Sequence, residues 1–235
     1  MLGCGREIGG LPCCTVIHGD CNDYLWLLPK GCVDLVVTDP PYGLNFVSGH
    51  RKVEYAPIVG DDLLPIETIK ALIELPRLGS YVWCRWDNLW EHGSLPIPKS
   101  LITWIKNNGT GSGDVRHEHN RQTEVALFYP GPEHVFKSRP FDIIDARRTG
   151  NPGHPTQKPV ELITAMLKWY DFETVLDPYM GSGTTAEAAM QLGKHFLGFE
   201  IDATHYATLS GRIGSFRGRP EPMDGGLWGG EVNNQ

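Results

Sequence analysis

Short apolar runs alternate with amphipathic segments along most of this chain. Apolar runs bounded by Gly, Pro or Asp are typical of strands buried in a parallel sheet. They predict strands at residues 13–18, 33–38, 81–84, 100–106, 123–129, 174–177 and 195–200. Segments with apolar residues at helical spacing predict helices at residues 22–28, 65–78, 86–92, 159–170, 184–192 and 203–213. The alternation of strands with helices indicates an α/β fold with a doubly wound sheet.

The segments outside these elements set the domain boundaries. Residues 1–12 are Gly-rich and are expected to form a flexible lead-in, and residues 216–235 are rich in Gly, Pro and Asn and are expected to be disordered. Residues 13–215 then form a single domain. Long polar or irregular stretches at 43–62 and 130–155 are expected to be loops, which at that length are usually functional or mobile.

The composition is that of an ordinary globular domain, with 40% hydrophobic residues, 21% charged residues and a formal net charge of −7. No global basic field points to a nucleic-acid partner, although a local basic cleft suffices for one. Because no apolar stretch approaches the roughly 20 residues that span a bilayer, we expect no membrane association. The six cysteines form no Cys-x-x-Cys pair and have no His at zinc-finger spacing, so we interpret them as reduced thiols of a cytoplasmic protein and expect no metal.

The strand at 33–38 is followed directly by Asp39-Pro40-Pro41-Tyr42. Two prolines stop the strand, fix two φ angles and hold the preceding residue extended. The result is a rigid turn that carries one carboxylate and one aromatic ring at the carboxyl end of a strand. Ligands of open α/β sheets bind outside these strand ends, although an ordinary turn would carry similar residues.

A second candidate site lies between the strand at 174–177 and the helix at 184–192. Its sequence, Asp177-Pro178-Tyr179-Met180-Gly181-Ser182-Gly183-Thr184-Thr185, brings glycines and a helix amino terminus together, which suits a carboxylate or phosphate. Glu200 ends the next strand, where an acid can bind both ribose hydroxyls. From the residues alone, this pattern fits a dinucleotide as well as other adenosyl cofactors, and the absence of Gly-Lys-Ser/Thr excludes a P-loop.

Taken together, the two motifs resemble those of the amino-methylating DNA methyltransferases, in the order of the beta group. The resemblance covers roughly residues 13–212 and rests on Gly19-Asp20, on Asp39-Pro40-Pro41-Tyr42-Gly43, on His154-Pro155-Thr156-Gln157-Lys158-Pro159 and on the glycine loop 177–185. It implies a mostly parallel, seven-stranded, Rossmann-like methyltransferase fold. It also implies a catalytic role for residues 13–215 and S-adenosyl-L-methionine as the cofactor.

The resemblance assigns roles to individual positions. Asp39, Pro40, Pro41 and Tyr42 would be catalytic, and Tyr179 stands where the family usually has Phe. The implied cofactor-binding residues are Asp20, Cys21, Thr156, Lys158, Asp177, Pro178, Tyr179, Gly181, Ser182, Gly183, Thr184, Thr185 and Glu200. Within this set, Thr156 and Lys158 would bind the methionine carboxylate, Glu200 the ribose and Asp20 the adenine amino group.

The chemistry of such a reaction can be argued from the residues. An exocyclic amino group is a poor nucleophile because its lone pair is conjugated with the ring. Asp39 and the Pro40 carbonyl can each accept one N–H, which frees the lone pair toward a sulfonium methyl group. Tyr42 offers a stacking face for a base rotated out of the duplex.

Double-stranded DNA is the partner that the resemblance implies, in DNA methylation and restriction–modification. The cationic candidates for phosphate contacts are Arg51, Lys52, Arg116, Arg121, Lys137, Arg139, Arg147 and Arg148. The interval available for target recognition, residues 130–153, is short for this family. We therefore expect a short or relaxed recognition site, with the 43–62 loop, a partner or a second copy of the chain (a homodimer) as alternative sources of specificity.

Adenine N6 is favoured as the acceptor because the tetrapeptide begins with Asp, whereas cytosine-N4 enzymes more often have Ser there. Cytosine N4, an RNA base and a protein amide are alternative acceptors. A catalytically silent protein that binds the cofactor or DNA, and a nicotinamide dehydrogenase, are alternatives of other classes.

Overall fold

A single eight-stranded sheet lies at the centre of the part of the chain that the computed structural model describes, residues 5–43, 64–107, 116–117, 119, 121–148 and 157–217. Its strands are β3 (Thr15–His18), β4 (Leu35–Thr38), β5 (Gly79–Cys84), β6 (Ser100–Ile105), β7 (Thr123–Pro130), β8 (Ile143–Asp145), β9 (Thr174–Asp177) and β10 (His195–Glu200). They are ordered β3-β10-β9-β4-β5-β7-β6-β8. Only β7 runs against its neighbours among these eight, so the sheet is mostly parallel.

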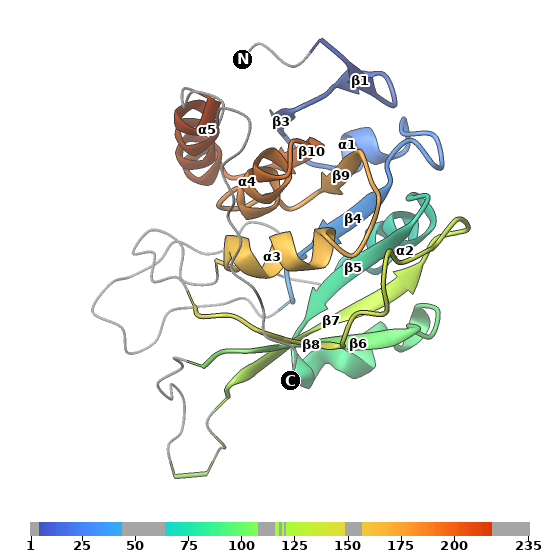
Figure 1. The fold of residues 1–235 in the computed structure, drawn as a ribbon, viewed down its shortest axis with the longest axis vertical. Coiled ribbons are helices and arrows are strands. Elements are labelled where there is room, and N and C mark those ends of the chain that lie inside the picture. The colour runs from blue at the N-terminus through green and yellow to red at the C-terminus, as the bar shows by residue number, and fades with distance from the viewer. Residues whose placement is uncertain are drawn as a thin grey trace.

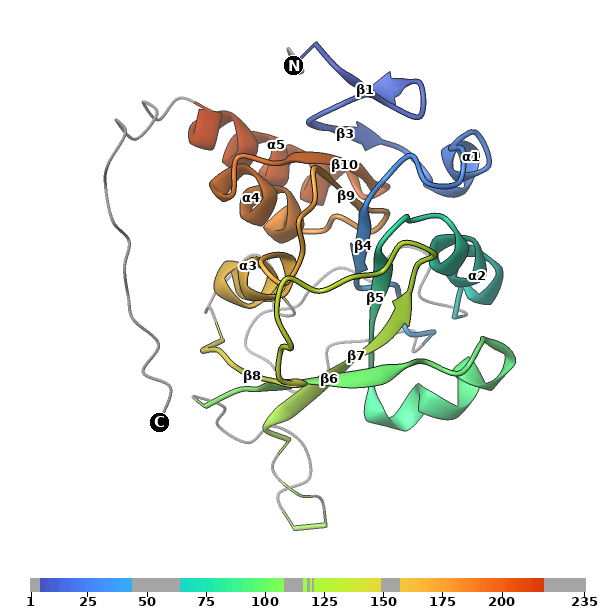
Figure 2. The same ribbon diagram turned by 45° about the vertical axis from the view of Figure 1, so that its right-hand side comes forward.

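Helices cover both faces of this sheet (Figure 1). They are α1 (Asn22–Leu25), α2 (Ile66–Glu74), α3 (Val160–Leu167), α4 (Thr184–Gln191) and α5 (Ala203–Arg217), with a 3-10 helix η1 at Trp86–Ser94. In both views, α3, α4 and α5 lie together on one side of the sheet, and α1 and α2 lie on the other (Figure 2). No described helix is both long and apolar enough to traverse a bilayer.

The two faces of β9 show how the strand sequence builds both layers. Val175 packs in the core with α3 and α4 residues such as Leu162 and Ala188, whereas Leu176 packs with Leu25 and Leu72 of α1 and α2. All of these side chains are buried. Alternate residues of a strand point to opposite faces, and both faces are covered here, so a continuous apolar run is the pattern this position requires.

A buried acid joins the amino ends of the two central strands. Asp34, directly before β4, accepts hydrogen bonds from the backbone N–H groups of Glu173 (2.6 Å) and Thr174 (3.0 Å) at the start of β9. The Arg77 guanidinium lies 2.7 Å from the other carboxylate oxygen. Burial acts to raise the pKa of Asp34, but these donors and the Arg77 charge leave it below its ordinary value.

The predicted fold class is confirmed, and the strands at 174–177 and 195–200 have the predicted bounds. The expected count of seven strands is wrong for the described residues, because Ile143–Asp145, within the stretch expected to be irregular, adds β8 at the sheet edge. The predicted lead-in contains a short hairpin of β1 (Glu7–Ile8) and β2 (Leu11–Pro12). The predicted tail, except for the last two residues of α5, and nearly all of the 43–62 loop lie outside the described residues.

The strand order reverses direction at β4. From β4 the chain passes through α2 to β5 on one side, whereas β9, on the other side of β4, leads through α4 to β10. Such a switch point leaves a crevice at the carboxyl ends of the strands, which is where open α/β sheets bind ligands.

Candidate active site

Four adjacent parallel strands, β3, β10, β9 and β4, end in the side chains that the sequence singles out. Asp39 follows β4, the glycine loop follows β9, Glu200 ends β10 and Asp20 follows β3. β4 pairs directly with β9, with Leu35 opposite Val175. The two motifs, more than a hundred positions apart in the chain, therefore lie at one edge of the sheet.

Asp39 is held by two polar neighbours. Tyr42, three residues later in the same turn, donates its hydroxyl to one carboxylate oxygen, and the Lys158 ammonium lies 2.5 Å from the other. The Asp39 side chain is 28% exposed, so the carboxylate is accessible at the site. Each carboxylate oxygen has a second lone pair, so the group keeps the capacity to accept a further N–H.

Lys158 joins the two motifs physically. Its ammonium binds Asp39, while its backbone carbonyl accepts a hydrogen bond of 3.1 Å from the hydroxyl of Thr184, the first residue of α4. A single residue, Lys158, thus bridges the Asp39 turn and the end of the glycine loop. The residue before α3, Pro159, fixes the backbone directly after Lys158.

Lys158 also belongs to a row of alternating charges. Its ammonium lies 3.2 Å from Glu124 of β7, and Glu124 binds Lys106 at the end of β6. Burial alone would lower the pKa of Lys158, but the charges of Asp39 and Glu124 raise it above its ordinary value. Burial likewise acts against the Glu124 charge, yet Lys158 and Lys106 hold its pKa below the usual range. The row Asp39–Lys158–Glu124–Lys106 carries no net charge, which makes its burial tolerable.

Two tryptophans line this row. The Lys158 ammonium lies 5.2 Å from the centroid of the Trp83 ring on β5, and the Lys106 ammonium lies 5.2 Å from that of Trp104 on β6. The two rings meet edge to face at 6.3 Å. Cations over tryptophan faces gain from the ring quadrupole, and more so where water is excluded.

The glycine loop is organised by Asp177. One carboxylate oxygen accepts the Tyr179 N–H at 3.2 Å, and the other accepts the Thr185 hydroxyl of α4 at 2.6 Å. Burial raises the pKa of Asp177 to about 7, with the nearby Asp39 charge acting in the same direction. Gly183, at φ +80°, is the N-cap residue of α4, and a Cβ there would also meet the Leu209 Cβ at 3.3 Å.

Glu200 and Asp20 complete this edge. Glu200 is buried and accepts the N–H groups of Gly181 at 2.7 Å and Asp202 at 2.8 Å. Asp20 accepts the N–H of Asn22 at 2.9 Å, directly before Cys21, the N-cap residue of α1. Cys21 and the Tyr179 hydroxyl are hydrogen-bonded, so the ends of β3 and β9 are connected. Burial raises the pKa of the Cys21 thiol to about 12, so this thiol is not a reactive thiolate.

These groups fit an adenosyl amino-acid cofactor. The first N–H groups of α4 have no partner within the helix and suit a carboxylate. Glu200 keeps a lone pair on each oxygen for ribose hydroxyls, and the second Asp20 oxygen can accept an amino group. The glycine backbone lets a ligand approach the loop closely.

The structure divides the cationic candidates between two edges of the sheet. Arg121 precedes β7, and Arg147 and Arg148 follow β8; both points lie at the edge that carries Asp39, because β7 is reversed. Lys137, whose backbone N–H binds the Trp169 carbonyl, lies with Arg139 at the opposite edge. These five side chains and that of Arg116 are exposed. Arg51, Lys52 and Thr156 lie outside the described residues.

The sequence patterns did not single out two residues of this site. Glu124 and Lys106 were visible only as a lone charge near the start of an apolar strand and a lone charge at the end of another. Sheet order brings them to Lys158, and that order has no local sequence signal. The ammonium of Lys158 is bound on the Asp39 side of the site, so its expected contact with a cofactor carboxylate stays a prediction.

The chain is similar in sequence to known DNA methylases. A family model described as DNA methylase, for N6 and N4 methylation, matches residues 132–210. A protein of Escherichia coli (strain K12), provisionally named the methylase YubD, is 26% identical over 79% of this chain and 83% of its own length. The type II methyltransferase M.BglII of Bacillus subtilis is 26% identical over 83% of this chain and 69% of its own length.

Two solved structures share the fold. The complex of M1.HpyAVI with SAM has a TM-score of 0.63 at 22% identity, covering 84% of this chain and 98% of that one. The cytosine-N4-specific PvuII DNA methyltransferase has a TM-score of 0.63 at 15% identity, covering 89% of this chain and 87% of that one. The family model, the relatives and the Rossmann-like methyltransferase fold agree, so this chain is similar to DNA methylases of the N6-adenine and N4-cytosine type.

Proposed function

We propose that this protein transfers a methyl group from S-adenosyl-L-methionine to the exocyclic amino group of a base in double-stranded DNA, with adenine N6 as the preferred acceptor. One observation carries the proposal. Lys158 binds the Asp39 carboxylate through its ammonium and Thr184 through its carbonyl, so the acid that would hold the base lies beside the loop that would hold the cofactor.

The cofactor assignment is supported by the donor and acceptor groups at the glycine loop. The α4 amino terminus would bind the methionine carboxylate, Glu200 the ribose and Asp20 the adenine amino group. M1.HpyAVI, a protein with this fold, has been solved as a complex with SAM. When bound, the cofactor supplies a methyl group on a positively charged sulfonium.

Asp39 and Pro40 would activate the base. The Asp39 carboxylate and the Pro40 carbonyl each accept one N–H of the amino group, which frees the nitrogen lone pair from the ring. Asp39 and Pro40 would thus hold the nitrogen so that its lone pair could form a bond to the methyl group that the cofactor would supply, with the C–S electron pair left on the sulfur of the cofactor. The nitrogen then releases one proton toward Asp39, and Lys158 and Tyr42 hold that carboxylate in a fixed orientation.

Adenine is preferred on the basis of the Asp in the tetrapeptide. Cytosine N4 is the second candidate, favoured by the likeness to the PvuII enzyme. The chain would be incubated with methyl-tritiated cofactor and unmethylated DNA, and the DNA then digested to nucleosides. N6-methyldeoxyadenosine is the expected product; N4-methyldeoxycytidine in its place would reassign the acceptor.

A silent binding protein is distinguished by the Asp39→Ala variant. For an enzyme, we expect loss of methyl transfer with cofactor affinity unchanged by calorimetry, because Asp39 lies outside the cofactor loop. A wild-type protein that binds the cofactor and DNA but yields no methylated nucleoside would support the silent alternative. Titration with NAD in parallel tests the dehydrogenase.

The short 130–153 interval supports a short or relaxed recognition site. Sequencing modified bases in genomic DNA exposed to the enzyme measures the site directly, and a long defined motif would count against this expectation. Repeating the assay across protein concentrations, with light scattering on the same samples, tests whether a homodimer is the active form.

A further inference from the structure

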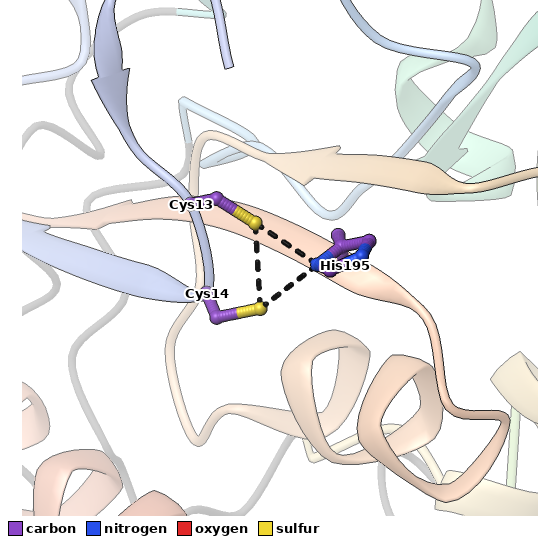
Figure 3. Close-up of side chains that lie close together, drawn as sticks. All are labelled: Cys13, Cys14 and His195. Atoms are coloured by element: carbon purple, nitrogen blue, oxygen red, sulfur yellow. Dashed lines mark hydrogen bonds between the residues drawn. The ribbon is translucent and has the colours of Figure 1, made fainter. Parts of the chain in front are cut away.

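A cluster of three metal-ligand side chains lies away from the proposed active site, at the amino ends of β3 and β10 (Figure 3). The Cys13 and Cys14 sulfurs are 3.4 Å apart, and the His195 Nδ1 lies 3.1 Å from the first and 3.4 Å from the second. All three atoms point toward one another in the close-up. The histidine comes from 181 positions after Cys14, so no cysteine spacing along the chain could have indicated it.

The backbone holds the two thiols in this unusual arrangement. Adjacent residues of an extended strand point to opposite faces. Cys14, however, has a φ of +55°, the one positive φ of a non-glycine residue in the described parts of the chain. A β-carbon makes this conformation costly, so its presence at one of the two clustered cysteines marks a constrained position.

Hydrogen bonds fix each of the three residues independently. The Cys13 N–H binds the Arg6 carbonyl at 2.9 Å, the Cys14 N–H binds the Phe196 carbonyl at 2.7 Å and the His195 N–H binds the Glu173 carbonyl at 2.8 Å. Cys13 is buried and the other two are half-buried. The donors are therefore preorganised on a rigid sheet edge, one of the requirements of a built site.

The spacings suit a tetrahedral ion with thiolate and imidazole ligands. In tetrahedral geometry, zinc bonds of about 2.3 Å to sulfur and about 2.0 Å to nitrogen place two sulfurs about 3.8 Å apart and sulfur and nitrogen about 3.5 Å apart. Each distance in the cluster would open by about half an ångström or less to reach these values. Two sulfurs and an imidazole select a thiophilic ion over a hard one such as Mg²⁺.

We propose that Cys13, Cys14 and His195 bind a thiophilic divalent cation of the zinc class, with water or another donor as the fourth ligand. The role is structural. Glu200, at the other end of β10, is separated from His195 by about 16 Å of strand, so the ion would not touch the reacting groups. It would instead join the segment that follows the β1–β2 hairpin to the amino end of β10.

Binding of the ion breaks the contact between Arg6 and His195. Its guanidinium lies 3.1 Å from the His195 Nε2, which requires that nitrogen to accept and the proton to reside on Nδ1. Metal binding replaces the Nδ1 proton and moves it to Nε2, and the exposed Arg6 side chain turns away. The two thiols give up their protons as the metal–sulfur bonds form.

The test uses the full-length protein, reduced with a phosphine, stripped with a chelator and titrated with Zn²⁺ or with Co²⁺ as a spectroscopic probe. We expect about one equivalent bound, a thiolate-to-cobalt charge-transfer band and a melting temperature raised by several degrees with Zn²⁺. Cys13→Ser, Cys14→Ser and His195→Gln should each weaken binding at least tenfold. Cys32→Ser, a half-buried thiol outside the cluster, should bind as the wild type does.

His195→Gln keeps the interpretation clear, because a half-buried ring should be replaceable without loss of the fold, which circular dichroism verifies. Binding unchanged in His195→Gln, or no band in the reduced wild type, overturns the proposal and leaves a hydrogen-bonded thiol–imidazole cluster. Methyl transfer serves as a separate readout, since its failure would concern the proposed function and not the ion.

Discussion

Replacing Lys158 with Met removes the cation between Asp39 and Glu124 while keeping most of the side-chain length. Lys158 is only 7% exposed, so its loss leaves two carboxylates facing each other with no cation between them. Removing one partner of a buried ion pair costs about 3–5 kcal/mol. Because Asp39 and Glu124 are 28% and 31% exposed, solvent screening places the expected cost at the lower end, about 3 kcal/mol.

A loss of about 3 kcal/mol in a chain of this size lowers the melting temperature by about 6–12 °C. The rate of methyl transfer should fall by more than the loss of folded protein accounts for. A displacement of a reacting group by about 1 Å can cost about 100-fold in rate, and Lys158→Met releases one of the two groups that orient Asp39. Tritium transfer to DNA at a temperature where the variant is fully folded measures this loss separately.

The matched control is Lys168→Met, which removes an exposed lysine just after α3 and should change neither quantity. The double variant Lys158→Met, Glu124→Gln removes the Glu124 charge that faces Asp39, so it should regain part of the stability but none of the activity. Wild-type methyl transfer in folded Lys158→Met would refute the argument that Lys158 positions Asp39, the proposed catalytic acid.

Three further predictions follow from the described geometry. Gly183→Ala, strained at φ +80°, should cost about 1–2 kcal/mol and weaken cofactor binding, whereas Gly214→Ala in open space on α5 should not; equal effects would contradict the loop's role. Because the pKa of Asp34 is lowered from 3.8, its stabilisation is present above about pH 4 and is lost as pH falls through the folded value. Acid denaturation should accordingly be shallower for Asp34→Asn, and parallel curves would exclude this linkage. Arg121→Ala should reduce the salt dependence of DNA binding by about one unit of log–log slope, and Lys137→Ala, at the far edge, should leave it intact.

Local patterns predicted most of the strands and helices because each is set by its own residues. Residues 174–177 have two β-branched residues and a leucine before an acid, and both bounds are those of β9. The three residues of β8 offered no such signal, since Ile143 and Asp145 are exposed and the strand is defined by its pairing with β6. The hairpin at 7–12 was equally short of apolar content. Elements specified by a neighbour rather than by their own pattern were the ones missed.

The residues of the candidate site likewise include some that the sequence could predict and some that it could not. Asp39 and the glycine loop were predictable because prolines and glycines have backbone requirements that are visible in sequence. Glu124 was not predictable, since its significance depends on β7 being placed beside β5 and running in reverse. That reversal puts the start of β7, and with it an acid near the start of an otherwise apolar strand, at the edge where Lys158 needs a second counter-charge.

The row of charges also explains how the partly buried Asp39 carboxylate is held at this edge of the sheet. Asp39 alone at the end of a buried strand would incur a desolvation cost of several kcal/mol. Lys158 offsets this cost only if its own burial is compensated, which Glu124 on β7 and then Lys106 at the end of β6 provide. The acid that would receive the base is therefore supported by strands β7 and β6, which contribute nothing to the cofactor loop. On this reasoning, the reversed strand has a place in the site beyond closing the sheet, because it supplies the charge that makes Lys158, and through it Asp39, tolerable at that edge.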